Sequence, residues 1–433
     1  MIPSLIVAAV TCAVMIASIL FFPKIKLGKL SLDSYWVVVL AGAVVMLVCR
    51  LVSLRTLWRA LSDPSPINPL KILILFLSMT LLSVFLDEVG FFRYLANKAL
   101  LFAGKSQVKM FATVYWTVSL LTVFTSNDVV VLTFTPFLCY FAKNAKIDPK
   151  PYLIAEFVAA NTMSMMLMIG NPTNIYIATS YEIAFADYFL VMALPTLASA
   201  TLSFALLYLL FHKSLHAPVM AVPEQVRIED KPMLALGLSL LLLTTALLVV
   251  GPYVGAPMWL ISASAVGVLV LAVLILCAAR KTPPKELGRT LRRAPWQLVP
   301  FVLGMFVLIL ALEQQGVTAK IGSLLGAKAT IAKYGALSFL SANVINNIPM
   351  SVLFCPIVGT LPAGQTLPAA YATVIGSNLG AFLTPIGALA GIMWLSLLKK
   401  HDIKMGYLDF IKYGAVVAVP SLATALAILA LTV

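Results

Sequence analysis

The sequence has very few charged residues. Asp, Glu, Lys and Arg make up 11% of it, whereas 61% of the residues are hydrophobic and the mean hydropathy is +1.02. Soluble globular chains carry about 25% charged residues, so this composition excludes that class. Apolar runs of about 20 residues are typical of membrane-spanning helices and differ from the weak alternation of an outer-membrane barrel. The composition therefore predicts an all-α polytopic membrane protein.

Residues and motifs that carry enzyme chemistry are also scarce. The three histidines, His212, His216 and His401, fall in predicted loops, and the five cysteines are scattered without C-x-x-C spacing. We interpret the cysteines as packing residues. The chain has no G-x-x-x-x-G-K-[S/T] loop, which argues against a built-in ATPase. We therefore expect neither an enzyme nor a bound metal.

Hydrophobic runs predict the membrane spans. The N-terminal run lacks the charged segment and small-residue cleavage site of a signal peptide, so we interpret it as a retained span. Two further apolar segments, at about 108–142 and 330–358, are interrupted at their centres by polar residues. The uninterrupted runs lie at about 2–22, 34–53, 69–87, 151–180, 185–212, 233–250, 257–279, 296–315, 369–398 and 410–432.

The two interruptions are the most informative features of the sequence. The first is Thr125-Ser126-Asn127-Asp128, and the second is the asparagine-rich stretch 341–349. Polar groups are costly at membrane depth, so such patches indicate a functional site. Each segment is either two full crossings or one re-entrant hairpin. Matching breaks in two halves of a chain are typical of transporters built from inverted repeats.

The positive charges indicate the topology. When the loops are assigned to alternate sides, most of the 30 Lys and Arg residues fall on one side. By the positive-inside rule that side is cytoplasmic, so both termini face outward and the excess positive charge does not indicate nucleic-acid binding. The first interrupted segment then opens from the cytoplasm and the second from outside. The opposite side has only Arg50, Arg55, Arg59, Lys71, Lys320, Lys328 and Lys333.

Two spaced motifs recur in the second half of the chain. An acid-x-x-Gly element at Asp87 recurs at Glu313, and the spacing from Asn127 to Pro136 recurs from Asn347 to Pro356. These matches predict an internal repeat. We place the first repeat at residues 1–212, a cytoplasmic linker at 213–232 and the second, inverted repeat at 233–433.

Each half contains a second break after its interrupted segment. Gly170-Asn171-Pro172-Thr173-Asn174 interrupts one span, and the stretches 376–380 and 384–387 interrupt the other. Pro and Gly free backbone groups, which membrane-depth helices tolerate only beside protein or a wet cavity, and freed helix ends bind ions. One such break alone would be a packing kink, but four symmetric breaks predict one binding site. Its candidate solute-binding residues are Ser126, Asn127, Asn171, Thr173, Asn174, Asn346, Asn347, Ser377, Asn378 and Thr384.

Acidic residues near these breaks are candidates for ion coupling. Asp128 is the only carboxylate that we place inside a break, so it is the first candidate for proton or cation coupling; the alternative is a structural carboxylate held by neighbouring amides. We expect Asp87 and Glu88 to be a solvated helix cap, and Glu156 is a weaker candidate for a proton route. The basic stretch 280–293 is predicted to be a topogenic loop that can meet anionic headgroups.

These motifs resemble a known family. The stretch from Thr125 to Asp128, followed by Thr135-Pro136, resembles the hairpin motif of ArsB/NhaD-type permeases of the ion transporter superfamily. The stretches 85–92, 346–349, 374–380 and 384–387, with Trp394, look like elements of arsenite efflux permeases. Two stretches depart from that pattern. Residues 147–156 and 170–174 look more like the pigmentation P-protein and sodium-coupled anion-transporter branches.

The resemblance covers roughly residues 70–425 and implies a function. It implies two inverted repeats, a transport domain with both hairpins, and elevator-like alternating access. It also implies export of arsenite or antimonite, As(III)/Sb(III), in exchange for H+ across a bacterial inner membrane, with no cofactor beyond the proton gradient. A cytoplasmic ATPase subunit is consistent with some arsenite pumps, and the oligomeric state is left open. Sodium-coupled transport of an oxyanion or carboxylate, Na+/H+ exchange and a passive channel remain alternatives.

Overall fold

The chain folds almost entirely into helices. The computed structural model describes residues 2–27, 30–64, 68–216 and 226–433. Its elements are α1 (Ile2–Phe21), β1 (Lys24–Leu27), β2 (Leu30–Asp33), α2 (Ser34–Val48), α3 (Leu54–Ser62), α4 (Pro69–Glu88), α5 (Phe91–Ala103), α6 (Gln107–Phe124), α7 (Asn127–Ala145), α8 (Lys150–Met163), η1 (Met168–Gly170), α9 (Pro172–Ser180), α10 (Phe185–Phe211), η2 (Ser214–His216), α11 (Lys231–Val250), η3 (Gly251–Val254), α12 (Met258–Ala279), α13 (Lys285–Arg293), α14 (Leu298–Gln314), α15 (Val317–Leu325), α16 (Thr330–Ile345), α17 (Asn347–Val358), α18 (Ala363–Gly380), α19 (Leu389–Lys400) and α20 (Tyr407–Thr432).

The prediction of an all-α membrane protein is confirmed. Within the described ranges, seven helical stretches are long and apolar enough to cross a membrane, at Ile2–Phe21, Pro69–Glu88, Phe185–Phe211, Lys231–Val254, Met258–Ala279, Lys285–Gln314 and Tyr407–Thr432. Each overlaps a span predicted from hydropathy. The one sheet in this part of the chain is the short antiparallel pair of β1 and β2, which the sequence analysis did not predict.

The repeated acid-x-x-Gly element has the same backbone conformation in both halves. Gly90 follows α4 and begins α5 with φ 87°, and Gly316 follows α14 and begins α15 with φ 71°. Left-handed φ values of this kind favour glycine because a Cβ would be strained there. The repeated glycines therefore turn the chain in the same way at two corresponding points.

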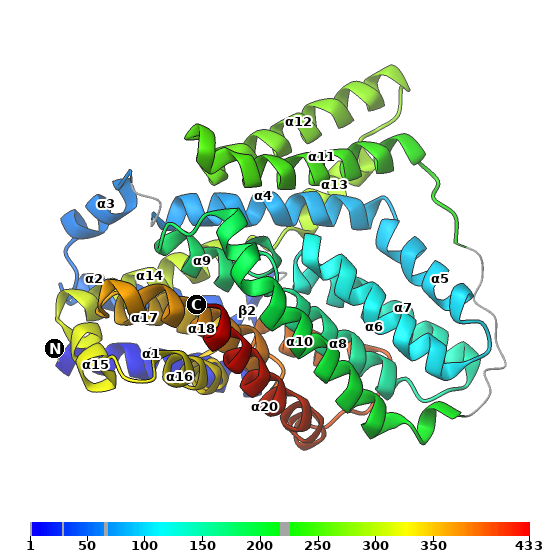
Figure 1. The fold of residues 1–433 in the computed structure, drawn as a ribbon. Coiled ribbons are helices and arrows are strands. Elements are labelled where there is room, and N and C mark those ends of the chain that lie inside the picture. The colour runs from blue at the N-terminus through cyan, green and yellow to red at the C-terminus, as the bar shows by residue number, and fades with distance from the viewer. Residues whose placement is uncertain (1, 28–29, 65–67, 217–225) are drawn as a thin grey trace.

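Helix packing is also reciprocal between the halves. Helix α2 packs on α14 of the second half, and α12 packs on α4 of the first. Figure 1 shows α11 and α12 lying along α4. In the same way α7 contacts α19, α17 contacts α9, and the long helices α10 and α20 pack on each other. The exact limits of the two repeats stay a prediction.

Both interrupted segments are helical hairpins. Helices α6 and α7 contact each other and both pack on α5 and α8, so the chain turns back at Thr125 and Ser126. Helices α16 and α17 both pack on α18, and Asn346 between them has φ 72°. The breaks lie where the polar patches predict them, although Asn127 and Asp128 already belong to the first turn of α7.

The breaks in the two long spans differ from the prediction. The first is wider than expected, because α8 ends at Met163 and α9 begins at Pro172. The second is only partly as predicted: residues 376–380 are helical, whereas the predicted stretch 384–387 does lie in the irregular segment 381–388. Gly376 serves close packing instead, since an added Cβ would lie 2.0 Å from Ser338 Oγ and 2.3 Å from the Gly335 carbonyl of α16.

The short helices α3, α5, α13 and α15 were not predicted as separate elements. Part of the predicted linker 213–232 lies outside the described residues. Before that gap, η2 follows α10, and after it, α11 begins the second half at Lys231.

Candidate functional site

The break between α8 and α9 is bonded to one side chain of the second half, Asn378 of α18. Its Oδ1 accepts hydrogen bonds from Ser164 Oγ (2.8 Å) and Asn171 Nδ2 (3.1 Å). Its Nδ2 donates to Asn174 Oδ1 (2.6 Å) and to the Val374 carbonyl (2.8 Å). The three partner side chains and Val374 are all buried, so this amide cluster joins the two halves in the interior of the protein.

Proline and asparagine shape the first half of the cluster. Asn171 is the N-cap of α9, and its Oδ1 accepts from the backbone N–H and the hydroxyl of Thr173, both at 3.1 Å. Asn174 Nδ2 donates to the Ser164 carbonyl at 2.8 Å, which a regular helix would have used internally. Pro172 suits the first turn of α9 because the N–H it lacks would have had no helical partner.

The first hairpin is tied to the same cluster. Asn127 Nδ2, at the start of α7, donates to Asn161 Oδ1 of α8 at 3.0 Å. Asn161 lies one turn before Ser164, whose hydroxyl proton can be donated either to the Asn161 carbonyl (2.9 Å) or to Asn378 Oδ1 (2.8 Å). The C-terminal end of α8, through Asn161 and Ser164, therefore contacts both the hairpin tip and α18.

The second hairpin is tied to the break that follows α18. Asn343 Nδ2 donates to the Gly380 carbonyl (3.0 Å), and its Oδ1 accepts from the N–H (3.0 Å) and hydroxyl (2.7 Å) of Thr384. Asn346 Nδ2 donates to the Ile386 carbonyl at 2.9 Å, and the Asn347 N–H donates to the Gly387 carbonyl at 3.0 Å. Each hairpin tip is thus fastened to the broken span of its own half.

Eight of the ten candidate solute-binding residues therefore fall into three groups. Asn171, Thr173, Asn174 and Asn378 form the central cluster, Asn346, Asn347 and Thr384 lie at the second hairpin, and Asn127 lies at the first. Ser377 is buried, and its hydroxyl has no hydrogen-bond partner among the described residues. Ser126 and Asp128 lie apart from the amides, on the wall of a cavity. Their roles in binding stay predictions.

Three network members were missed as site residues. Asn161 lies in α8 and Ser164 is its C-cap, both before the predicted break, and Asn343 lies in α16 before the hairpin tip. The signal that could have found them is the same one that identified the breaks. Each is an amide or hydroxyl residue in an otherwise apolar helix, close in sequence to a break, and such groups need partners at membrane depth.

A cavity of about 260 Å³ lies between the first hairpin and the surrounding helices. Its hairpin wall is Ser126, Asp128, Val129 and Leu132 of α6–α7, and Leu389, Ile392 and Met393 of α19 adjoin it. Helices α1, α2, α4 and α14, with the chain before α14, form the opposite wall. That wall consists of Ile19, Pro23, Asp33, Tyr35, Phe76, Thr80, Val84, Arg292, Arg293, Ala294, Pro295, Gln297 and Leu298.

Asp128 is the carboxylate that this cavity exposes on the hairpin side. It is partly exposed, and within the described ranges its side chain makes no hydrogen bond or ion pair. The structural alternative, a carboxylate held by neighbouring amides, is therefore wrong for this conformation: Asn127 turns to Asn161 instead. Asp128 therefore faces the cavity, and its role in proton or cation coupling stays a prediction.

The corresponding position in the other half is nearly closed. Ile348 follows Asn347 as Asp128 follows Asn127, and it lines a hollow of only about 20 Å³ between α9, α17, α4 and α14. The hollow is apolar apart from Ser351. The two hairpins therefore face hollows of unequal size, about 260 Å³ at Asp128 and about 20 Å³ at Ile348.

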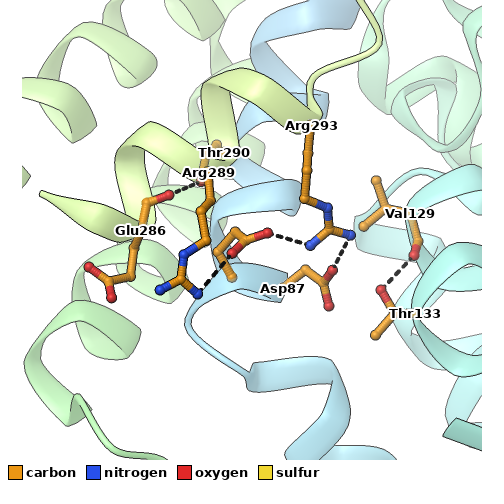
Figure 2. Close-up of polar contacts among 8 residues, drawn as sticks. Asp87, Val129, Thr133, Glu286, Arg289, Thr290 and Arg293 are labelled. Atoms are coloured by element: carbon orange, nitrogen blue, oxygen red, sulfur yellow. Dashed lines mark hydrogen bonds and ion pairs between the residues drawn. The ribbon is translucent and has the colours of Figure 1, made fainter. Parts of the chain in front are cut away.

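Helix α13 stands at the mouth of the cavity and corrects two predictions. Figure 2 shows Arg293 of α13 reaching Asp87 at the end of α4, with Thr133 of α7 beside it. Arg293 pairs with Asp87 (2.7 Å) and with Glu88, while Arg289 lies 3.7 Å from Glu88. The carboxylates are only 8% and 7% exposed, so they are not a solvated cap.

The basic stretch before α14 is likewise not an open loop. Leu287 and Thr290 of α13 are buried against α4, while Arg292 and Arg293 point to the cavity. The ion pairs explain this arrangement, because two nearly buried carboxylates need cationic partners. The sequence did not predict these ion pairs because about 200 residues lie between the partners.

Glu156 of α8 is not part of the cavity. It is fully buried, and Thr135 Oγ1 of α7 lies 3.0 Å from both of its carboxylate oxygens. The cavity wall does not include it. Glu156 thus joins α8 to the first hairpin away from the surface that Asp128 presents.

Two helical hairpins, two broken spans and a cavity at one hairpin define a membrane transporter of the two-hairpin type. Residues 33–376 match the family model described as citrate transporter (CitMHS), so the chain belongs to this family and to the ion transporter superfamily.

Curated relatives and a solved structure agree with this assignment. The "Arsenical pump membrane protein" of Escherichia coli is 29% identical over 373 residues, which cover 82% of this chain and 85% of the relative. The "Putative arsenical pump membrane protein" of Bacillus subtilis is 28% identical, with coverages of 86% and 88%. The Alcanivorax borkumensis YdaH transporter has a similar fold, with a TM-score of 0.57 and 15% identity over 99% of this chain and 98% of that one.

Proposed function

We propose that this protein exports arsenite or antimonite in exchange for protons, with Asp128 as the proton-exchanging group. The observation that carries the proposal is the position of Asp128, a carboxylate without a partner in the described structure on the wall of a 260 Å³ cavity. The names of the relatives in Escherichia coli and Bacillus subtilis support the metalloid as the solute.

The chemistry of the cavity supports coupling between the proton and movement of the hairpin. The wall opposite Asp128 includes Phe76, Val84 and Leu298, which cannot solvate a charged carboxylate. Moving an unpaired charge along such a surface costs several kcal/mol, whereas a protonated carboxyl group costs far less. Asp128 would therefore release its proton into an open cavity and need a proton before the hairpin crosses.

The amide network supports a neutral, hydroxylated solute. Asn171, Asn174 and Asn378 offer both donors and acceptors, as the hydroxyl groups of As(OH)₃ or Sb(OH)₃ require. In the present conformation these amides bond to one another. A solute that reaches them would exchange those bonds for its own, and Ser126 and Asp128 lie on the cavity through which it would pass.

The unequal size of the hollows at the two hairpins supports alternating, elevator-like access. In that account the closed hollow at Ile348 opens when the cavity at Asp128 closes. A single cysteine at Met393, in the cavity, would react with a thiol reagent added from the side of α13, and one at Val352 would not. Equal labelling of both positions from one side would contradict alternating access.

A second candidate rests on the cations at the cavity mouth. Arg292 and Arg293 line the cavity, and an anion such as an oxyanion or carboxylate would find positive charge there. The name of the family model favours the same candidate. Because Arg293 is paired with Asp87 and Glu88, the positive charge available to an anion in the cavity comes mainly from Arg292.

Flux measurements in everted vesicles separate the candidates. We expect a proton gradient to drive arsenite uptake that a protonophore abolishes and that Asp128→Asn loses. Asp33→Asn, which removes a carboxylate at the far wall of the same cavity, is the matched control and retains coupling. Sodium-stimulated flux of citrate or another anion, without arsenite movement, would overturn the proposed solute in favour of the second candidate.

A further inference from the structure

An apolar groove on the surface of the molecule is formed by two helices whose charged residues are all basic. It lies between α5 and α6 and has a volume of about 580 Å³. Phe102, Trp116 and Leu120 line it with large exposed side chains, 82%, 38% and 64% exposed respectively. Lys98 is the one charged side chain among its lining residues.

The charged residues of α5 and the start of α6 all have one sign. Between Glu88 and Asp128 the sequence has no acidic residue and four basic ones, Arg93, Lys98, Lys105 and Lys109, all of them exposed. Lys98 extends over the ring of Tyr94, with Nζ 5.6 Å from the ring centroid. Within the described residues these four cations make no ion pair.

We propose that this groove binds an anionic phospholipid, with its phosphate at Lys98 and an acyl chain along Phe102, Trp116 and Leu120. An apolar groove lined by one lysine matches both parts of such a molecule, because the acyl chain removes apolar surface from water and the headgroup neutralises Lys98. A tryptophan at the groove suits the boundary between headgroups and hydrocarbon. A zwitterionic lipid offers the same chains without the net charge.

The groove lies beside the helix that connects α4 to the first hairpin, so a bound lipid would affect movement of the hairpin. Helix α5 joins α4 to the first hairpin, and it packs on both α6 and α7. Figure 1 shows α5 continuing from the end of α4 toward α6 and α7. A lipid held between α5 and α6 would contact the connection that any movement of the hairpin must bend. This site does not depend on the solute or on the role of Asp128.

The test compares phosphatidylglycerol with phosphatidylcholine on the purified full-length protein in detergent. Native mass spectrometry counts the retained lipids, and thermal unfolding records the stabilisation. We expect preferential retention of phosphatidylglycerol, which Lys98→Gln weakens about fivefold, the effect of one cation near an anionic surface. Lys98→Arg should restore it. Lys320→Gln, an exposed lysine of α15 in the other half, is the matched control and should bind as the parent does.

A second variant tests the groove itself. Thr117→Trp fills the space beside Trp116 and leaves every charge in place, so it should also reduce the retention of phosphatidylglycerol. Equal retention of the two lipids by the parent, or unchanged phosphatidylglycerol binding by both Lys98→Gln and Thr117→Trp, would overturn the proposal. Loss in Thr117→Trp with no change in Lys98→Gln would overturn the assignment of the phosphate to Lys98.

Discussion

Replacing Asn378 by alanine should destabilise the protein more than any other single amide truncation in the cluster. The change removes four hydrogen bonds at once and leaves Asn171 Nδ2 without its acceptor and Asn174 Oδ1 with only a weak contact from Thr173, at 3.4 Å. A buried polar group that loses its partner costs roughly 1–3 kcal/mol. Two such groups give an expected loss of about 2–6 kcal/mol of unfolding free energy.

The neighbouring residue provides the control for this prediction. Ser377 is equally buried, on the same helix, and its hydroxyl has no partner among the described residues, so Ser377→Ala removes an unsatisfied group. We expect Ser377→Ala to unfold at or above the temperature of the parent in detergent, and Asn378→Ala well below it. If Asn378→Ala unfolded with the parent, or if both variants lost stability equally, the cluster would not join the two halves as described.

Two further variants test packing and charge. Gly376→Ala should destabilise the protein by at least about 1–3 kcal/mol, because its Cβ would overlap Ser338 and Gly335 of α16. Gly364→Ala in the same helix meets nothing within 4 Å and should be neutral in the same thermal unfolding assay. Arg293→Gln should lower the free energy of unfolding by about 1–3 kcal/mol, because the nearly buried carboxylates of Asp87 and Glu88 lose their main cationic partner. Arg289→Gln should lower it by less than about 1 kcal/mol, because the Arg289 side chain is 56% exposed and lies 3.7 Å from Glu88. Equal losses within either pair would contradict the packing or the ion pairs.

The sequence predicted most of the fold because hydrophobic runs and polar interruptions carry much of the information in a membrane protein. The spans and the two hairpin tips follow from patterns along the chain, and the repeated glycines Gly90 and Gly316, noted in the sequence only as a repeat, share a left-handed φ. The short helices were not predicted, because nine to thirteen residues between spans leave little periodicity. Gly376 and Gly380 were misread as a break, because a glycine that permits close packing looks like one that ends a helix.

Long-range partners explain what was missed in the site. The polar breaks identified Asn171, Asn174 and Asn378 as a group, and hydrogen bonds join them. The sequence could not show that Arg293 pairs with Asp87 and Glu88, because their positions depend on how α13 folds onto α4. It also could not show that Asp128 lies on the cavity while Asn127 faces the amides. These two neighbours point in different directions only because of the register of α7.

The central claim is that Asp128 couples solute movement to protons. The most direct measurement is proton movement into reconstituted vesicles when an arsenite gradient is imposed, for the parent and for Asp128→Asn, beside arsenite–arsenite exchange without a gradient. The account predicts that the parent moves protons against the arsenite flux, and that Asp128→Asn retains exchange but moves no protons. Undiminished arsenite-driven proton movement in Asp128→Asn would contradict it.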